Sequence, residues 1–588
     1  MKRILFSILA SGICAGASAI PAKPGFVAYT QPDGSVINIR ISGDEHCHMI
    51  YSESGHLLVE SDGRMEYAMF DSSGFPKSSG IAVRSFKEDF SLSEELQPKY
   101  LVDGWAEKLL ANKSRRFEKL QANAYKRNLL TRSDDDDTQD EGESRLVPMN
   151  FGRCEATFPV MGKQKGLVIL VEYADEKFNY GDFDYFNRML NEEGFSDFGS
   201  LGSARDWFIE NSNGLFLPDF DVYGPVELPN ERKYYGGNDG FGNDLHPEEM
   251  AIDACRILDD TVDFSQYDRD GDGMIDNVFI FYAGKGEHDS GVKNAVWPHS
   301  WDVAAVHPLE EFVFDGVRLN HYACTCEYPS GYKRPDGIGT FIHEFSHVMG
   351  LPDLYNTNTM TAGYTPGGWS VMDNGPYNND RLTPPNYSSF EKCALGWLEY
   401  EPLKAGMNEL PDLSSTNIAF ALPTEKDNEF FFFENRQQHG NDEFIPGHGM
   451  LVWHVDYNKG AWAANTVNNA SSHQRVDIVE ADNTRSEATR DGDSFPGVTG
   501  NTSLTFDSKP QLASWAKKRL AYDIEDISES EDGIITFNAV VYDTNGVESI
   551  AGLESAGGNK TYFDLTGRKV NNPDKGIYIV DGRKVLVK

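Results

Sequence analysis

The sequence predicts a multidomain protein of mixed α and β structure. At 588 residues, the chain is longer than one hydrophobic core usually serves. Residues 20–100 and 405–543 are dominated by short β-type runs that are separated by turn signals. Between these regions, helix-type stretches alternate with apolar strand-type runs. We therefore expect a central α+β domain at 146–404, with a β-rich segment before it and a β-sandwich and a small β module after it.

The net charge limits the classes of partner. Fifty-three basic residues against 92 acidic ones give a formal charge of −39. A surface this acidic repels nucleic acid and anionic membranes, so neither is expected as a partner. The composition instead fits a soluble secreted protein, including one that holds Ca²⁺.

Residues 1–19 have the pattern of a signal peptide. Lys2-Arg3 forms the charged start, Ile4–Ala15 is an apolar run, and Ala17-Ser18-Ala19 is a small-x-small cleavage site. Cys14 leaves a lipoprotein anchor as an alternative, although it lies inside the apolar run. No other run is long enough to cross a bilayer. The sequence therefore predicts a secreted or cell-surface protein without membrane insertion.

Residues 20–145 are expected to form a β-rich domain and a linker. Pro32-Asp33-Gly34 and Ser61-Asp62-Gly63 are two of the turn signals between its short β-type runs. An acidic run from Ser133 to Glu143 is most simply a solvated, disordered linker. Arg132 and Arg145 flank this run, so the linker is expected to be easily cut.

The central domain is expected to begin with a buried strand at 166–173. Helices are predicted at 202–209, 250–258 and 384–397, and a strand or hairpin at 215–226. The last of these helices is expected to lie behind the metal site described below.

A run of alternating aspartates matches most of a calcium-binding loop. Its members, at loop positions 1, 3, 5, 6, 7 and 9, are Asp268, Asp270, Asp272, Gly273, Met274 and Asp276. Carboxylate oxygens and the Met274 carbonyl suit Ca²⁺, but Phe279 stands at position 12, where a bidentate Glu is usual. The sequence predicts a structural Ca²⁺ site whose shell Asp276 or a distant acid must complete. An acidic turn without an ion is the alternative.

The stretch from His343 to Asp353 has the pattern H-E-x-x-H-x-x-G-x-x-D. On a helix, His343 and His347 lie on one face and can bind one Zn²⁺ together. Glu344 can reach a metal-bound water and act as its general base. Gly350 can adopt a positive φ and turn the chain back, so that Asp353 brings a carboxylate to the same ion. The pattern predicts a zinc site; a helix that carries two histidines by chance is the alternative.

Met372 lies in a glycine-rich turn, Gly367–Gly375, shortly after this pattern. The order resembles the Met-turn of the metzincin peptidases, in which the thioether forms an apolar floor under the metal. Tyr377, just beyond, is a candidate to stabilise an oxyanion. Glu391 is an alternative third zinc ligand, as in thermolysin-type sites.

The C-terminal third of the chain changes to short strands. Runs such as Glu429–Glu434, Gly449–Asp456 and Ile534–Val541 predict a β-sandwich over 405–543. Residues 544–588 are a separate module with two strand runs and glycine turns, too small to be an enzyme.

With these residues, the chain resembles the immune inhibitor A family of secreted bacterial zinc peptidases over roughly residues 146–500. The segments that carry the resemblance are His343–Tyr355, Trp369–Gly375, Asp268–Gly286, Gly202–Gly214 and Phe432–Asp456. It implies a metzincin-like catalytic fold with bound Ca²⁺ and an N-terminal pro-segment at 20–145, hence a zymogen. The chain departs from the pattern at Asp353, where most metzincins have His, and no tyrosine follows Met372 more closely than Tyr377, which leaves the oxyanion partner open.

The module at 544–588 resembles the sorting domain of the Bacteroidetes type IX secretion system. This resemblance implies export by that outer-membrane secretion machinery, with the module cleaved or used for surface attachment.

The sequence thus predicts a zinc endopeptidase that acts on protein or peptide substrates. Zn²⁺ lowers the pKa of a bound water, and Glu344 takes its proton and later delivers one to the leaving amine. His46-Cys47-His48 in the pro-segment is a candidate to cap the zinc, although an ordinary strand is the simpler interpretation. A calcium-dependent surface adhesin with an inactive peptidase domain is the alternative from another class.

Overall fold

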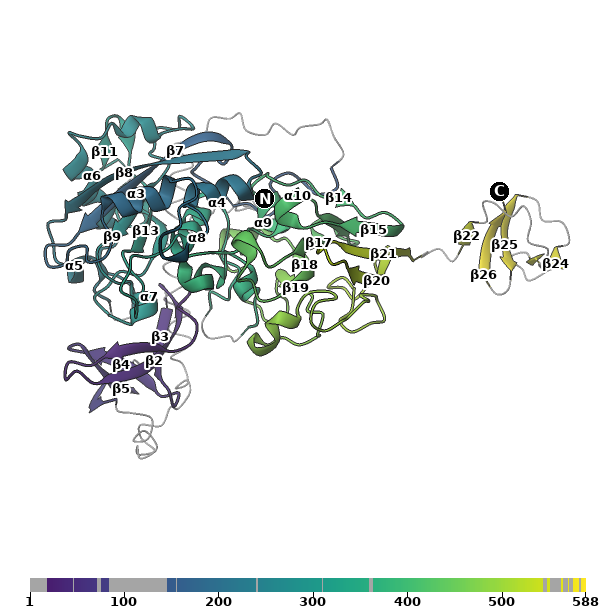
Figure 1. Ribbon diagram of the computed structural model, residues 1–588, viewed down its shortest axis with the longest axis horizontal. Helices are drawn as coiled ribbons and strands as arrows, with labels where there is room; N and C mark the ends of the chain where they lie inside the picture. The colour runs from purple at the N-terminus through teal and green to yellow at the C-terminus, as the bar shows by residue number, and fades with distance from the viewer. Residues whose placement is uncertain are drawn as a thin grey trace, which may run out of the picture.

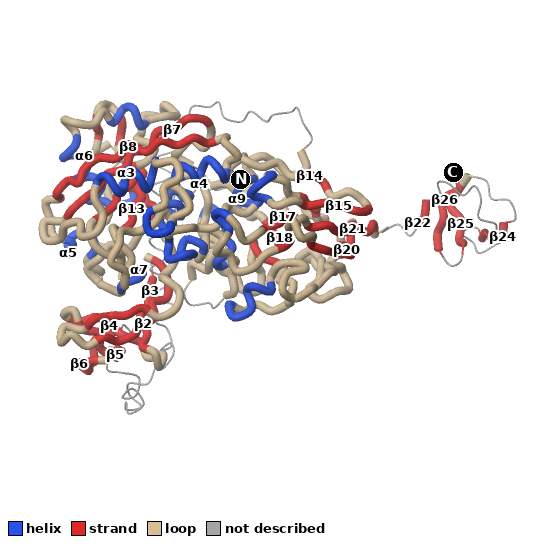
Figure 2. Tube along the Cα trace, in the orientation of Figure 1, coloured by secondary structure: helices blue, strands red, loops and turns tan. Residues whose placement is uncertain are grey.

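The computed structural model describes residues 18–45, 47–70, 76–83, 145–154, 156–239, 242–308, 310–358, 363–542, 547–549, 562–563, 569–570, 575–580 and 583–587. Most of the predicted signal peptide and the whole acidic linker at 133–143 lie outside these residues. Figure 1 shows an N-terminal β unit, a large central body and a small C-terminal β unit, and Figure 2 shows how helices and strands are distributed among them. None of the helices in the described ranges is long and apolar enough to cross a membrane.

A five-stranded sheet forms the centre of residues 162–326. In spatial order its strands are β10 (His299–Asp302), β13 (His321–Cys326), β9 (Val278–Tyr282), β7 (Gly162–Glu172) and β8 (Phe216–Glu227). β13, β9, β7 and β8 run parallel, whereas β10 pairs antiparallel with β13 at one edge. The strands predicted at 166–173 and 215–226 are confirmed as β7 and β8.

Helices cover both faces of this sheet, which explains why its central strands are apolar on both sides. The main helices are α3 (Phe183–Asn191), α4 (Ala204–Asn211), α6 (Glu248–Leu258) and α8 (Gly339–Val348). Val168 and Leu170 of β7 belong to one core with α3, α4 and α8. Leu167 and Ile169 belong to a second core with α6. The helices predicted at 202–209 and 250–258 are confirmed as α4 and α6.

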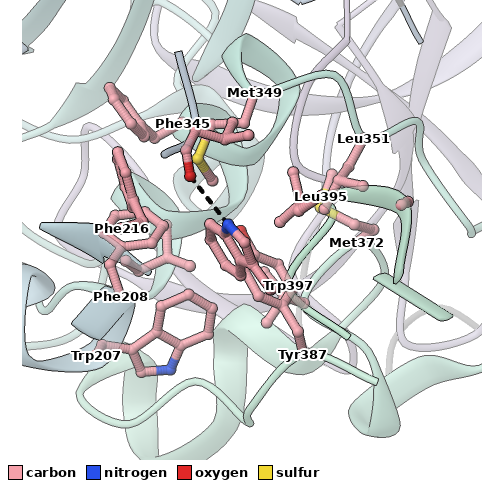
Figure 3. Packing of buried hydrophobic residues seen from close by; sticks show 14 of the residues in the cluster. Trp207, Phe208, Phe216, Phe345, Met349, Leu351, Met372, Tyr387, Leu395 and Trp397 are labelled. Carbon is pink, nitrogen blue, oxygen red and sulfur yellow. Dashed lines mark hydrogen bonds between the residues drawn. The ribbon is translucent and has the colours of Figure 1, made fainter. Parts of the chain in front are cut away.

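Aromatic packing fixes the rotation of α8. The Phe341 and Phe345 rings lie 5.1 and 5.4 Å from the ring of Phe220 in β8. Figure 3 shows Phe345 among the other buried side chains of this core. His343 and His347 follow these phenylalanines by two residues, about 200° around a helix of 3.6 residues per turn. The histidines therefore point away from the aromatic core.

Two further sheets lie in residues 401–541. The first is β14 (Glu401–Pro402), β16 (Phe420–Pro423), β17 (Glu429–Arg436), β18 (Gly449–Asp456) and β19 (Val476–Ile478); the second is β15 (Gly406–Leu410), β21 (Ile535–Val541) and β20 (Tyr522–Glu529). Phe431 and Phe433 of β17 share one core with Ile524 and Phe537 of the second sheet. The two sheets thus pack face to face around that core, as in a β-sandwich.

The opposite face of β17 joins the core of the central sheet. Phe432 and Trp453 belong to the same buried cluster as the side chains of α8. The Phe432 ring stacks on Tyr400 at 4.2 Å and on Phe390 at 6.3 Å. The units predicted at 146–404 and 405–543 therefore share a hydrophobic core.

The helix predicted at 384–397 is too long. The structure has α9 at Ser389–Ala394 only. Pro384 and Pro385 disfavour a helix before it. Ser388 caps its N-terminus in a reciprocal pair with Glu391, and Gly396, at φ +76°, follows its end.

The two terminal units are all-β. The N-terminal unit is an antiparallel meander of β1 (Val27–Thr30), β2 (Val36–Asp44), β3 (Cys47–Ser52), β4 (Leu57–Ser61), β5 (Arg64–Phe70) and β6 (Pro76–Ala82). Its core, which includes Ile39 and Tyr67, also contains Trp297 of the central unit. The C-terminal sheet has the order β22 (Val547–Ser549), β26 (Arg583–Val587), β25 (Gly576–Val580), β23 (Tyr562–Phe563) and β24 (Lys569–Val570).

Short elements complete the described residues. The short α-helices and strands are α5 (Arg232–Gly236), α7 (Glu287–Ser290), α10 (Leu413–Thr416), α11 (Lys459–Ala463), β11 (Val313–Phe314) and β12 (Val317–Arg318). The 3₁₀ helices are η1 (Asp197–Gly199), η2 (Phe264–Tyr267), η3 (Val303–Ala305), η4 (Gly367–Trp369), η5 (Gly375–Arg381), η6 (Gly440–Asp442) and η7 (Glu487–Gly492).

The shared core predicts a large effect of Phe432→Ala. Removing this buried ring is expected to lower the free energy of unfolding by about 3–5 kcal/mol, measured by urea titration. Phe444→Ala, at a ring that is 40% exposed, serves as the control and is expected to cost less than about 1 kcal/mol. Equal effects of the two substitutions would contradict a core that spans both units.

Candidate metal centre

α8 brings two histidine nitrogens together. The Nε2 atoms of His343 and His347 lie 3.2 Å apart, and their rings are nearly perpendicular at 86°. Both side chains are buried. This is the arrangement that their spacing of four residues predicted.

Backbone carbonyls hold both imidazoles from behind. His343 Nδ1 lies 2.7 Å from the Val371 carbonyl oxygen, and His347 Nδ1 lies 2.8 Å from that of Leu351. A carbonyl oxygen can only accept, so each Nδ1 carries the proton. Each Nε2 is left with a lone pair that faces the other, as metal-bound histidines require.

Gly350 returns the chain to the two histidines. Its φ is +97°, and a Cβ there would lie 2.8 Å from the Cys154 carbonyl oxygen, so only glycine fits. The turn is closed by the Leu351 N–H, which donates to the Ser346 carbonyl at 3.0 Å. Asp353 then places Oδ1 at 3.2 Å from His347 Nε2 and 3.4 Å from His343 Nε2.

Asn465 holds the Asp353 carboxylate in this position. The Asn465 side chain accepts from the Asp353 N–H at 2.8 Å and donates to Asp353 Oδ2 at 2.5 Å. Oδ1 is thereby left to face the histidines. Asn465 follows α11, 112 residues beyond Asp353, and no pattern in the sequence connected the two.

The three facing atoms fit a zinc ion. Ligand atoms about 2.0–2.2 Å from a tetrahedral Zn²⁺ lie about 3.3–3.6 Å apart, close to the separations seen here. Asp353 Oδ1 is buried and has no hydrogen bond within the described residues. The donor set of two imidazoles and one carboxylate suits Zn²⁺ with one position open.

Glu344 lies beside this cluster. Its carboxylate and the two imidazoles each place an atom within 4.8 Å of the others. Burial raises its pKa well above the usual range, and the carboxylates of Asp353 and Glu45 add to the rise. Glu344 Oε1 accepts a hydrogen bond of 2.8 Å from the N–H of Ile20, so an N-terminal segment crosses the site.

The Met372 turn supports the cluster through its backbone. Val371 holds His343, and the Met372 carbonyl accepts from the Leu354 N–H at 2.7 Å. The Met372 side chain is fully buried, and Figure 3 shows it in the part of the core that holds Leu351. The turn thus contacts His343, at the start of the H-E-x-x-H-x-x-G-x-x-D segment, and Leu354, the residue that follows the segment.

Other residues proposed near the site have different partners. Glu391 accepts from the Ser370 hydroxyl at 2.6 Å and caps α9, so Asp353 rather than Glu391 meets the histidines. Tyr377 donates to the Pro21 carbonyl at 2.6 Å. His48 Nε2 lies 3.2 Å from Glu287, and His46 lies outside the described residues.

The aspartate loop gathers three of its four carboxylates. Oxygen atoms of Asp268, Asp270 and Asp276 lie within 4.8 Å of one another. Burial raises the pKa of Asp276 to about 8, and Asp270 and Asp268 add to this. Asp272 accepts instead from the Met274 N–H at 2.8 Å and is not part of that group. Three carboxylates this close together form a group that could hold a cation.

Comparison with known proteins bears on this centre. Residues 161–399 match the family described as "Immune inhibitor A peptidase M6, catalytic domain". The matched range contains the central sheet, the aspartate loop, α8, Asp353 and Met372. The resemblance predicted from the sequence is confirmed for this segment.

Two relatives agree with that match. Immune inhibitor A of Bacillus thuringiensis subsp. alesti is 28% identical over 320 residues, 45% of this chain and 46% of the relative. Pre-pro-metalloprotease PrtV of Vibrio cholerae serotype O1 (strain M66-2) is 24% identical over 468 residues, 65% of this chain and 50% of the relative. The chain thus spans about half the length of the curated relatives it matches.

The geometry predicts which carboxylate holds zinc. Loss of a residue that only hydrogen-bonds a metal ligand usually lowers metal affinity by about 10–100-fold. Asp353→Ala removes a ligand itself and is expected to lower zinc affinity by more than this, measured by chelator competition. Glu391→Gln is expected to retain one zinc per chain, because Glu391 is committed to the α9 cap. Loss of zinc from Glu391→Gln alone would show that the ligand set is wrong.

Proposed function

We propose that this protein is a secreted zinc-dependent endopeptidase. The observation that carries the proposal is the convergence of His343 Nε2, His347 Nε2 and Asp353 Oδ1 beside Glu344. The match of residues 161–399 to a peptidase catalytic domain supports it. A calcium-dependent adhesin with an inactive peptidase domain is not favoured, because the donor atoms and the adjacent carboxylate are all present.

In the proposed reaction, the metal ligands position the ion and Glu344 transfers the proton. Zn²⁺, when bound, would lower the pKa of a water molecule to about 7 and polarise a peptide carbonyl. Glu344 takes a proton from the attacking water as its oxygen adds to the carbonyl carbon. Glu344 then gives that proton to the leaving nitrogen as the C–N bond breaks. One water is consumed, and one carboxyl and one amino end are formed.

The remaining predicted features are part of the same proposal. The N-terminal segment over Glu344 supports a zymogen whose pro-segment is released when the linker at 133–143 is cut. The predicted signal peptide supports export, and the C-terminal module is proposed to engage an outer-membrane secretion machinery. A Ca²⁺ held by Asp268, Asp270 and Asp276 would fix the loop that leads into β9, with Asp272 and the Met274 carbonyl as the other predicted ligands.

The general-base role predicts that Glu344→Gln abolishes catalysis without loss of metal. Casein cleavage is expected to fall by about 10²–10⁴-fold, the usual contribution of proton transfer by a positioned side chain. Zinc content, measured by atomic absorption, is expected to stay at one per chain because Glu344 is not a ligand. Glu443→Gln, at an exposed position, is the matched control. An active Glu344→Gln protein would rule out this mechanism.

The calcium proposal predicts a metal-dependent melting temperature. Ca²⁺ at 100 times its Kd is expected to stabilise the protein by about 2.7 kcal/mol relative to chelator. Asp276→Asn removes a buried ligand and is expected to abolish this difference, whereas Asp260→Asn at an exposed position keeps it. Calorimetry with and without Ca²⁺ makes the comparison. A wild-type melting temperature that is the same with and without Ca²⁺ would refute the site.

A further inference from the structure

Residues 18–20, at the end of the predicted signal peptide, cross the metal centre, and Ser18 forms an isolated antiparallel bridge with the central sheet. Ser18 and Ser300 exchange two backbone hydrogen bonds, of 3.1 and 2.7 Å, in antiparallel register. Ser300 belongs to β10, the edge strand of the central sheet. An edge strand offers unpaired backbone groups, and an extended peptide that pairs with it is held in a fixed register.

The next peptide group lies across the reacting centre. The Tyr355 hydroxyl donates to the Ala19 carbonyl oxygen at 2.6 Å. The N–H of the same peptide, at Ile20, donates to Glu344 Oε1 at 2.8 Å. Ala19 and Ile20 are fully buried. One peptide bond thus has a hydroxyl donor at its oxygen and the proposed base at its nitrogen.

This polarity is the one that peptide hydrolysis needs. Negative charge develops on the carbonyl oxygen when water adds to the carbon, and the nitrogen must receive a proton before it leaves. The two hydrogen bonds on the Ala19–Ile20 peptide meet these two requirements at the correct atoms. A substrate peptide bond in the same position would have the same two hydrogen-bonding partners as the Ala19–Ile20 bond.

We propose that Tyr355 is a catalytic residue that donates a hydrogen bond to the oxyanion of the substrate, and that Ala19–Ile20 marks the position of the scissile bond. The inference rests on the proposed peptidase function. Water adds to the carbonyl carbon, the C=O electrons move to oxygen, and the Tyr355 O–H stabilises that charge without losing its proton. When the C–N bond breaks, the carbonyl re-forms and the nitrogen leaves with the proton that Glu344 delivers.

The local chain explains why Tyr355 reaches this atom. After the turn at Gly350, residues 352–354 adopt no helix, and residues two apart in an extended chain point the same way. The side chains of Asp353 and Tyr355 therefore point toward the same metal centre. Tyr377, the tyrosine considered from the sequence, bonds to the carbonyl of Pro21, two residues beyond Ala19. Its contact positions the chain on the far side of the bond.

The test compares Tyr355→Phe with wild type in the full-length protein after its linker has been cut. With a quenched peptide from a mapped casein cleavage site, kcat is expected to fall by about 10²–10³-fold, the usual cost of one oxyanion donor. KM and zinc content are expected to change little. Tyr180→Phe, at a partly exposed ring, controls for the loss of a hydroxyl and is expected to keep the wild-type kcat.

A second readout does not depend on turnover. A phosphinic peptide with the sequence Ser18–Pro21 and a phosphinate in place of the Ala19 carbonyl mimics the charged tetrahedral state. Calorimetry is expected to show at least about 10-fold weaker binding to Tyr355→Phe than to wild type, because such analogues report transition-state contacts. If Tyr355→Phe loses zinc, Tyr355→His, which keeps a ring and an N–H donor, replaces it and is expected to retain part of the affinity.

The outcomes separate this inference from the proposed function. If wild type is active and zinc-loaded Tyr355→Phe has the same kcat and the same phosphinate affinity, the role of Tyr355 is overturned while the proposed peptidase function stands. Equal affinity of wild type, Tyr355→Phe and Tyr355→His would do the same. A zinc-loaded, processed wild type that cleaves nothing would overturn the proposed function and this inference with it.

Discussion

Three buried acceptor atoms that face one another impose the main constraint on this structure. His343 Nε2, His347 Nε2 and Asp353 Oδ1 lie 3.2–3.4 Å apart. The hydrogen bonds of these side chains are formed by their other polar atoms, the two Nδ1 atoms and Oδ2, which point away from the cluster. Lone pairs and a carboxylate at such distances are costly in a buried place unless a cation lies among them. The groups that hold them, at Val371, Leu351 and Asn465, must therefore be placed by the fold before the metal arrives.

These supports come from separate parts of the chain, which is why the domains depend on one another. Asn465 belongs to the unit that follows residue 404, and that unit shares its core with α8 through Phe432 and its neighbours. The N-terminal unit packs on Trp297, and the non-helical, non-strand segment before its first strand covers Glu344 through Ile20. The metal centre is thus a product of three units around one core and not of the helix alone.

Local spacing predicted the parts of the site that one helix and one turn determine. His343, Glu344 and His347 follow from the period of the helix, and Gly350 from the need for a positive φ. The third ligand was left open because a glutamate further along the chain, such as Glu391, could supply it, as in thermolysin-type sites. The Ser388-x-x-Glu391 pattern is a capping box and contained the signal that assigns Glu391 to the start of α9.

Contacts between distant segments could not be predicted from one sequence. Asn465 is 112 residues from Asp353, and Ile20 is 324 residues from Glu344. Tyr355 is close to the ligands in sequence, but its role depends on which peptide group lies opposite. The strands of the sandwich were predicted from short β-type runs separated by turns, whereas the sharing of its core with α8 follows from tertiary packing that such runs do not encode.

The central claim is that His343, His347 and Asp353 hold one zinc ion beside Glu344. Anomalous X-ray diffraction from crystals of the purified protein, recorded on both sides of the zinc absorption edge, tests it most directly. The account predicts one zinc peak about 2.0–2.2 Å from each of the three facing atoms. A peak bound by Glu391 or Glu344 in place of Asp353, or no zinc at α8 in metal-replete protein, would contradict it.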